Sequence, residues 1–189
     1  LSLSLQVHGG SGFLTDYPVE QYIRDQKIDS LYEGTTHIQA LDLLMRKVAR
    51  DGGATLQGLL SQIRETAERT GEGKELKTER AALGEAVGQL QTLLGTLMGK
   101  LGESVYHVGF QGNRVLFAVA EVIIGWLLVR HAAVALERTK TNPGDKAFYA
   151  GKVASARWYC HEVLPGIAHA ARMVENGNLA LMDLPEESF

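Results

Sequence analysis

Cysteine is almost absent from this sequence of 189 residues, which contains only Cys160. One cysteine cannot form an internal disulfide framework, and it supplies too few thiolates for a zinc or iron–sulfur site. We therefore expect no metal centre. A single free thiol is typical of a protein in a reducing compartment, which predicts a cytoplasmic location.

An excess of positive charge is also missing. The sequence has 19 Lys and Arg against 22 Asp and Glu, and its formal net charge is −3. Nucleic acids and anionic membrane surfaces are bound by clustered basic residues. Neither is therefore an expected partner.

No segment reads as a signal peptide or a membrane span. The chain begins at Leu1 without a basic n-region, which favours a start inside a domain whose larger N-terminal part lies outside this chain. The most apolar stretch, 115–129, is interrupted by Glu121 and is shorter than the roughly 20 residues that a span requires. We expect this stretch to form a helix inside a bundle.

The fold class indicated by the sequence is all-α, because apolar residues recur at helical spacing and no alternating strand pattern is found. Thr36 and Gln39 predict a capping box at the start of the helix that carries Ile38. The predicted helices are 18–27, one that carries Ile38, Leu41, Met45 and Val48, and then 54–69, 76–103, 112–138 and 145–175. Pro165 predicts a kink in the last helix, and 70–75 predicts a flexible connection.

A boundary between two domains is expected at Asp51-Gly52-Gly53, which divides the chain into 1–52 and 53–189. The second domain carries a seam with alternating spacings of four and three residues, typical of a helical bundle. The seam consists of Leu83, Val87, Leu90, Leu94, Leu97 and Leu101. Glycines 84, 88, 95 and 99 of the same helix predict close contact with a neighbouring helix.

Four short motifs follow one another near the start of the chain. They are Gln6-Val7-His8-Gly9-Gly10-Ser11-Gly12-Phe13, Asp16-Tyr17-Pro18, Arg24-Asp25 and Leu31-Tyr32-Glu33-Gly34-Thr35-Thr36. Their order and separations resemble the C-terminal part of the acyl-CoA dehydrogenases, flavoenzymes that desaturate acyl-CoA thioesters between the α and β carbons. The long remainder resembles the larger members, which carry an additional C-terminal helical domain. The resemblance therefore implies the end of the family's C-terminal helical bundle, followed by a further helical bundle.

The resemblance implies that Glu33 is the catalytic base. It would remove the α proton while the β hydride passes to FAD, forming a trans-2-enoyl-CoA as in fatty-acid β-oxidation. A carboxylate on a short loop can reach into a pocket, and Gly34 lets the backbone approach a thioester. Tyr32 and Gly34 are therefore the expected substrate-binding residues. Without the resemblance, Glu33 reads as a surface carboxylate ahead of a helix.

FAD is the cofactor implied by the resemblance. Gln6, Gly9 and Gly10 would contact the FAD of a neighbouring subunit, which implies a homo-oligomer, and Thr35 and His37 would also reach FAD. Family members often have glutamine at the position of His37. The alternative for the glycines is a structural turn between two helices. The further partners implied are an acyl-CoA substrate, the N-terminal and middle domains of the same enzyme, and an electron-transfer flavoprotein.

Two other functions remain open. An acyl-CoA oxidase uses the same base but passes electrons to oxygen. In isolation, the chain could instead be a non-catalytic helical interaction module, because the domains that hold most of the flavin and the substrate are missing. We expect the chain alone to be inactive.

Overall fold

The computed structural model describes residues 1–69 and 74–188, and all regular secondary structure in this part of the chain is helical. The all-α prediction is therefore confirmed. The N-terminal segments are α1 (Ser2–Val7), the short 3-10 helices η1 (Gly9–Phe13) and η2 (Ile28–Ser30) with α2 (Val19–Lys27) between them, α3 (Thr36–Leu41), and the π-helical η3 (Asp42–Val48). Residues 70–73 of the predicted connection lie outside the described residues.

The remaining helices form a bundle. They are α4 (Ala54–Glu68), η4 (Lys74–Leu76), α5 (Lys77–Leu101), α6 (Tyr106–Thr141), η5 (Pro143–Asp145), α7 (Lys146–Glu162) and α8 (Gly166–Asn176), followed by η6 (Ala180–Asp183) and η7 (Glu186–Ser188) in the C-terminal tail. The expected helix 112–138 is thus longer at both ends. The bounds of the preceding helix, α5, differ from the expected 76–103 by no more than two residues at either end.

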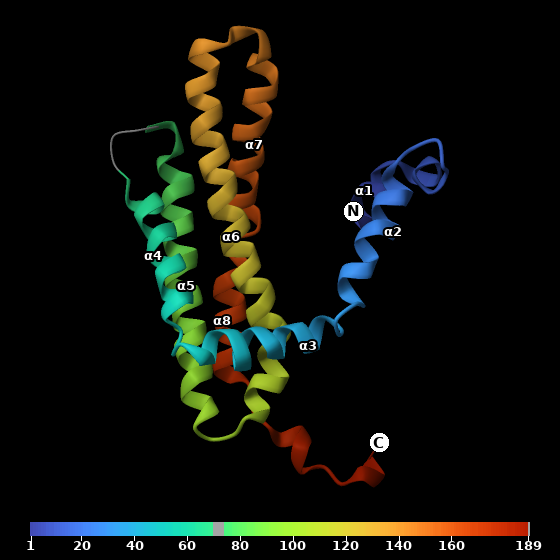
Figure 1. The fold of residues 1–189 in the computed structure, drawn as a ribbon, viewed down its shortest axis with the longest axis vertical. Coiled ribbons are helices and arrows are strands. Elements are labelled where there is room, and N and C mark those ends of the chain that lie inside the picture. The colour runs from blue at the N-terminus through green and yellow to red at the C-terminus, as the bar shows by residue number, and fades with distance from the viewer. Residues whose placement is uncertain (70–73, 189) are drawn as a thin grey trace.

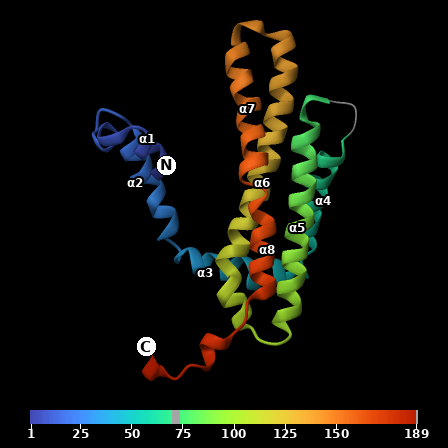
Figure 2. The same ribbon diagram turned by 180° about the vertical axis from the view of Figure 1, so that it is seen from behind.

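The molecule consists of an upright bundle and an N-terminal arm beside it. In Figure 1, α4 and α5 lie next to α6, and α8 continues the line of α7 toward the lower end of the bundle. Helix α3 crosses that lower end and connects to the arm, which contains α1 and α2. Figure 2, from the opposite side, shows the same separation between the arm and the upper bundle. The arm therefore reaches the bundle chiefly through α3, which packs against α6.

The core of the bundle is the predicted seam of α5. Its members Leu83, Val87, Leu90, Leu94 and Leu97 are buried, and Leu101 is partly buried against them. Leu60 and Ile63 of α4, a row of α6 valines, and Ile167 and Val174 of α8 belong to the same core. Burial of such side chains contributes roughly 1.5–3 kcal/mol each. Hydrophobic contact among these helices therefore holds the bundle together.

Helix α6 is long and apolar enough to span a bilayer, judged by length and composition alone. It is also the central helix of the bundle, in contact with α3, α4, α5, α7 and α8. Val115, Val122 and Val129 are buried in these contacts. This arrangement agrees with the expectation of a bundle helix, and the absence of a membrane span stays a prediction.

Two expectations about helix continuity and packing are wrong. The chain does not kink within one helix over 145–175 but breaks into α7 and α8, because Pro165 lacks an N–H and occupies the N-cap of α8.

The glycines of α5 do not mark a close helix contact. A Cβ on Gly84 would lie 3.5 Å from the Cβ of Ala67, an ordinary contact, and a Cβ at positions 88, 95 or 99 would meet nothing within 4 Å.

The stop signal at Asp51-Gly52-Gly53 behaves as predicted. Gly52 and Gly53 adopt positive φ angles of 64° and 82°, which end the preceding helix. The Asp51 carboxylate then accepts the backbone N–H of Gly53 at 3.0 Å and that of Thr55 at 2.9 Å, and so caps the start of α4. Hydrogen bonding, above all from the Thr55 hydroxyl, lowers the pKa of Asp51. The division into two domains at this point stays a prediction.

Candidate active-site loop

Glu33 has an unusual backbone conformation. Its φ is 53°, and it is the sole non-glycine residue with positive φ in 1–69 and 74–188. Non-glycine residues adopt this region only when the surrounding chain compensates its cost, and such residues cluster at functional sites. The Glu33 side chain lies on the exposed loop between η2 and α3.

Gly34 is required by the geometry of the same loop. Its φ is 103°, where L-residues are strained, and an added Cβ would lie 2.6 Å from Cγ2 of Ile38. A side chain at position 34 would therefore meet both backbone strain and a clash with the first turn of α3. The pair Glu33–Gly34 makes a tight reversal that places the carboxylate immediately before the helix.

The predicted capping box is wrong. Thr35, not Thr36, is the N-cap of α3, and its side chain makes no cap hydrogen bond. The Gln39 amide instead donates to the main-chain carbonyl oxygen of Glu33 at 2.8 Å. The reversal at Glu33–Gly34 brings that carbonyl over the first turn of the helix, where Gln39 meets it. Gln39 is thus a site residue that the sequence prediction assigned to a different role.

The residues expected to contact cofactor fall into two groups in this chain. Thr35 and the half-buried His37 lie beside Glu33 at the start of α3. Gln6, Gly9 and Gly10 lie in α1 and η1, which pack on α2 in the arm. Helix α2 and η2 separate them along the chain from the Glu33 loop. The chain alone does not bring the two groups together.

The glycine turn in the arm is open. Gly9 has a φ of 59°, and a Cβ at either Gly9 or Gly10 would meet nothing within 4 Å. The rings of His8 and Tyr17 pack at 5.1 Å between centroids and brace the turn from one side. The turn therefore leaves its backbone accessible to a ligand, and nothing within the described chain fills that space.

The arm does not have a core of its own. Between residues 1 and 35, Gly12 alone is buried. Large apolar side chains of this segment are exposed, including Leu3, Val7, Phe13, Leu14, Tyr22, Ile28, Leu31 and Tyr32. An apolar surface of this kind normally packs against other protein. Tyr32 belongs to it and lies next to Glu33, so the loop sits at the border of a surface that this chain leaves uncovered.

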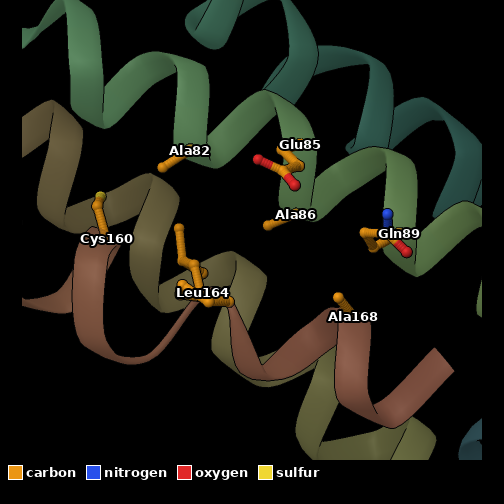
Figure 3. A pocket seen from close by; sticks show the side chains of 8 residues that line it. Ala82, Glu85, Ala86, Gln89, Cys160, Leu164 and Ala168 are labelled. Atoms are coloured by element: carbon orange, nitrogen blue, oxygen red, sulfur yellow. The ribbon is translucent and has the colours of Figure 1, made fainter. Parts of the chain in front are cut away.

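Nucleophilic and metal-dependent sites find no support elsewhere in the described residues. A pocket of about 110 Å³ lies between α5 and the α7–α8 junction. Figure 3 shows Cys160 at one end of it and small alanine side chains along it. Burial raises the pKa of the Cys160 thiol to about 11, so it is not an activated nucleophile. Within 1–69 and 74–188, His, Cys, Asp and Glu side chains form no group able to hold a metal ion.

One buried charge was not predicted. Glu79 of α5 is 4% exposed, and its Oε1 lies 3.7 Å from Arg157 Nε and 3.5 Å from His161 Nε2, both on α7. These residues are about eighty positions apart in the chain, and no local pattern connects them. The cluster joins α5 to α7.

Comparison with known protein families matches nearly the whole chain. Residues 1–48 match the family described as "Acyl-CoA dehydrogenase, C-terminal domain", and residues 59–185 match "Acetyl-CoA dehydrogenase C-terminal like". Both families are C-terminal parts of larger enzymes, and the first match contains the Glu33 loop. The class of protein is therefore a helical C-terminal portion made of two consecutive parts.

Curated relatives are similar in sequence over at least 95% of the chain. It is 45% identical to the broad-specificity linear acyl-CoA dehydrogenase FadE5 of Mycobacterium tuberculosis, over 100% of this chain and 32% of the relative. It is 34% identical to the 3-methylmercaptopropionyl-CoA dehydrogenase of Ruegeria pomeroyi, over 95% of this chain and 31% of the relative. A butyryl-CoA dehydrogenase of Syntrophomonas wolfei is 30% identical over 98% of this chain and 31% of its own length. The chain belongs to the acyl-CoA dehydrogenase family, and it spans about a third of the length of these relatives.

Proposed function

We propose that this chain is the C-terminal part of an FAD-dependent acyl-CoA dehydrogenase in which Glu33 is the catalytic base. The observation that carries the proposal is the conformation of Glu33, which is held at positive φ on a glycine-flanked loop just ahead of α3. Non-glycine residues with a backbone conformation of this kind cluster at active sites, which supports a functional role for Glu33. The relatives are named for acyl-CoA thioesters of different chains, which supports the same substrate class.

In this proposal the Glu33 carboxylate takes the α proton of a bound acyl-CoA. Gln39 fixes the main chain at Glu33, so the side chain starts from a defined position. Gly34 presents no side chain toward the substrate, and Tyr32, the neighbour of Glu33 in the chain, belongs to the exposed apolar surface of the arm. Residues outside this chain would complete the pocket and exclude water, which makes a carboxylate a stronger base.

The residues assigned to FAD are compatible with it. The open backbone at Gly9 and Gly10 can approach a planar ligand, since a Cβ there would meet nothing within 4 Å in this chain. Thr35 has a hydroxyl group that is not used as a cap. When bound, FAD supplies the acceptor for the β hydride. Because Gln6, Gly9 and Gly10 lie apart from Glu33, we propose that they serve the active site of a neighbouring subunit in a homo-oligomer.

The proposal extends to the product, the electron acceptor and the location. We propose a trans-2-enoyl-CoA product, as in β-oxidation, and an electron-transfer flavoprotein as acceptor in the cytoplasm. The relatives are named dehydrogenases, which favours this acceptor over oxygen. The peroxide yield in steady-state assays separates a dehydrogenase from an oxidase.

Glu33→Gln in the complete enzyme tests the role of the base. The amide keeps the shape of the side chain but cannot accept the proton, so we expect FAD binding to persist and dehydrogenation to fall by far more than tenfold. Glu68→Gln, an exposed position on α4, is the matched control and should retain activity. A loss of less than about tenfold, or roughly 1.4 kcal/mol in the barrier, would rule out Glu33 as the base.

A further inference from the structure

A groove between α4 and α6 collects arginine side chains. Its volume is about 560 Å³, and it is lined by the C-terminal part of α4, by Arg80 of α5 and by the C-terminal part of α6. Its charged lining residues are Arg69, Arg80, Arg130 and Arg138, together with Glu65 and Glu137. Four cationic side chains against two anionic ones give the groove a positive balance, whereas the chain as a whole has a net charge of −3.

Trp126 organises the floor of this groove. Its indole Nε1 donates a hydrogen bond to Thr66 Oγ1 at 2.8 Å, which locks the ring between α6 and α4. The guanidinium carbon of Arg130 lies 5.0 Å from the centre of that ring, a cation–π contact. Arg130 is therefore held in place before any ligand arrives. A preorganised guanidinium loses less side-chain entropy when it binds an anion.

The positive charge of the groove is only partly neutralised. Glu137 accepts a hydrogen bond at 2.8 Å from Lys140, which does not line the groove. Arg80 donates to the main-chain carbonyl of Arg69 at 3.1 Å and so ties the start of α5 to the end of α4. Within 1–69 and 74–188, neither Arg130 nor Arg138 has a carboxylate within ion-pair distance. Both guanidinium groups can accept an anionic ligand without giving up an existing ion pair.

The spacing of the arginines indicates the kind of anion. Arg130 and Arg138 are two helical turns apart, about 12 Å along the axis of α6. A diphosphate presents two phosphate groups, so each of the two guanidinium groups can bind one of them. We propose that the groove binds a small molecule that carries a diphosphate group.

This site is separate from the Glu33 loop. Helix α3 packs on α6 near Gly112, where a Cβ would lie 3.4 Å from the Cβ of Ala40. Trp126 lies fourteen residues further along α6, which corresponds to about 21 Å. The groove therefore acts independently of the catalytic role proposed for Glu33, and its test does not depend on that role.

Trp126 offers a direct readout. The chain has two tryptophans, and Trp158 on α7 is 62% exposed, so Trp158→Phe leaves Trp126 as the sole reporter at little structural cost. Pyrophosphate, which does not absorb near 280 nm, should change the Trp126 emission in a saturable manner. Isothermal titration calorimetry of the full chain with ADP should show binding at one site. Both affinities should fall as salt is added, because the contacts are charged and partly exposed.

Arg130→Gln and Arg138→Gln are the test variants, with calorimetry as the readout because Arg130 also affects the fluorescence of Trp126. Each should weaken ADP binding by about tenfold or more, the usual loss for one charged hydrogen-bonding contact. Arg172→Gln on α8, an exposed arginine that does not line the groove, is the matched control and should bind within about twofold of the parent chain. Circular dichroism shows whether each variant is folded, and Arg138→Gln keeps the test available if loss of the Arg130–Trp126 contact disturbs folding.

Several results would overturn the assignment. Absence of saturable binding by both pyrophosphate and ADP would do so, as would equal weakening by Arg172→Gln. Inorganic phosphate that binds as tightly as pyrophosphate would show a site for a single anion. Binding of coenzyme A without binding of ADP or pyrophosphate would show that the groove recognises another part of that molecule and not a diphosphate.

Discussion

The side-chain amide of Gln39 holds the main-chain carbonyl oxygen of Glu33 at 2.8 Å, from one turn inside α3. In the complete enzyme, Gln39→Ala should release the loop and lower kcat by roughly fivefold, which corresponds to the loss of about 1 kcal/mol from one hydrogen bond. FAD content should not change. Hydrogen exchange of residues 31–36 should become faster.

The matched control for Gln39 is Gln21→Ala, which removes an exposed side-chain hydrogen bond to Asp25 within α2. This change should leave both kcat and exchange at 31–36 as they are. If Gln39→Ala speeds exchange without lowering kcat, the hydrogen bond is structural and the loop does not need it for catalysis.

Gly10→Val tests whether the glycine turn meets a flavin. The turn has room for the new side chain within this chain, so the variant should fold normally. In the complete enzyme the branched side chain would occupy the space proposed for the cofactor, and we expect reduced FAD retention with a shift toward smaller assemblies, since binding and assembly are linked. Size-exclusion chromatography with flavin absorbance measures both. A fully loaded, fully oligomeric variant would mean that the turn is only structural.

Leu90→Ala tests the core of the bundle. Leu90 lies on the α5 seam with 0% exposure, so the cavity should lower the free energy of unfolding by about 2–5 kcal/mol. Met98→Ala, at 60% exposure on the same helix, should change it by less than about 0.5 kcal/mol. Urea denaturation of the full chain gives both values. Equal effects at the two positions would contradict the observed face of α5.

We expect the chain to lose stability in alkaline solution because the thiol of Cys160 is buried. Burial raises the pKa of its thiol from the usual 9.0 to about 11 in the folded chain. Above pH 9 the unfolded chain loses this proton while the folded chain keeps it, so the free energy of unfolding should fall as pH rises from about 9 to 11. The pKa of Tyr159 is raised to about 12 by burial and adds a further decline at higher pH.

Cys160→Ala isolates the contribution of the thiol. The variant should lose less stability than the parent chain between pH 9 and 11, as followed by urea denaturation at several pH values. Iodoacetamide should label the parent chain slowly under native conditions and quickly in urea. Rapid native labelling, or identical pH profiles for the two chains, would show that the thiol is not buried in solution.

Much of the fold could be predicted because helical periodicity is a local property. The α5 seam needed only the spacing of its leucines, and the stop at Gly52–Gly53 needed only two residues able to adopt positive φ. The break at Pro165 was placed correctly but predicted as a kink. Local rules say that proline interrupts a helix, whereas contacts with other helices decide whether the two halves stay aligned.

The candidate site was predictable in its residues and not in its geometry. The motif Tyr32-Glu33-Gly34-Thr35 indicated which side chain would be the base, and that assignment stays a prediction. The same residues did not reveal that Gln39 would bond to the Glu33 carbonyl instead of closing a capping box. The choice depends on the reversal at Glu33–Gly34, which places that carbonyl over the helix.

The sequence by itself determined the helical class, the extent of most helices and the resemblance to the acyl-CoA dehydrogenase family, which the comparisons confirm. Each of these depends on residues that are close together in the chain. Only the tertiary structure decided which charged residues lie close together. Glu79 forms an ion pair with Arg157, and arginines of α6 line the same groove as Arg69 and Arg80. Residues so far apart along the chain become neighbours only when burial of the apolar helix faces fixes how the helices pack.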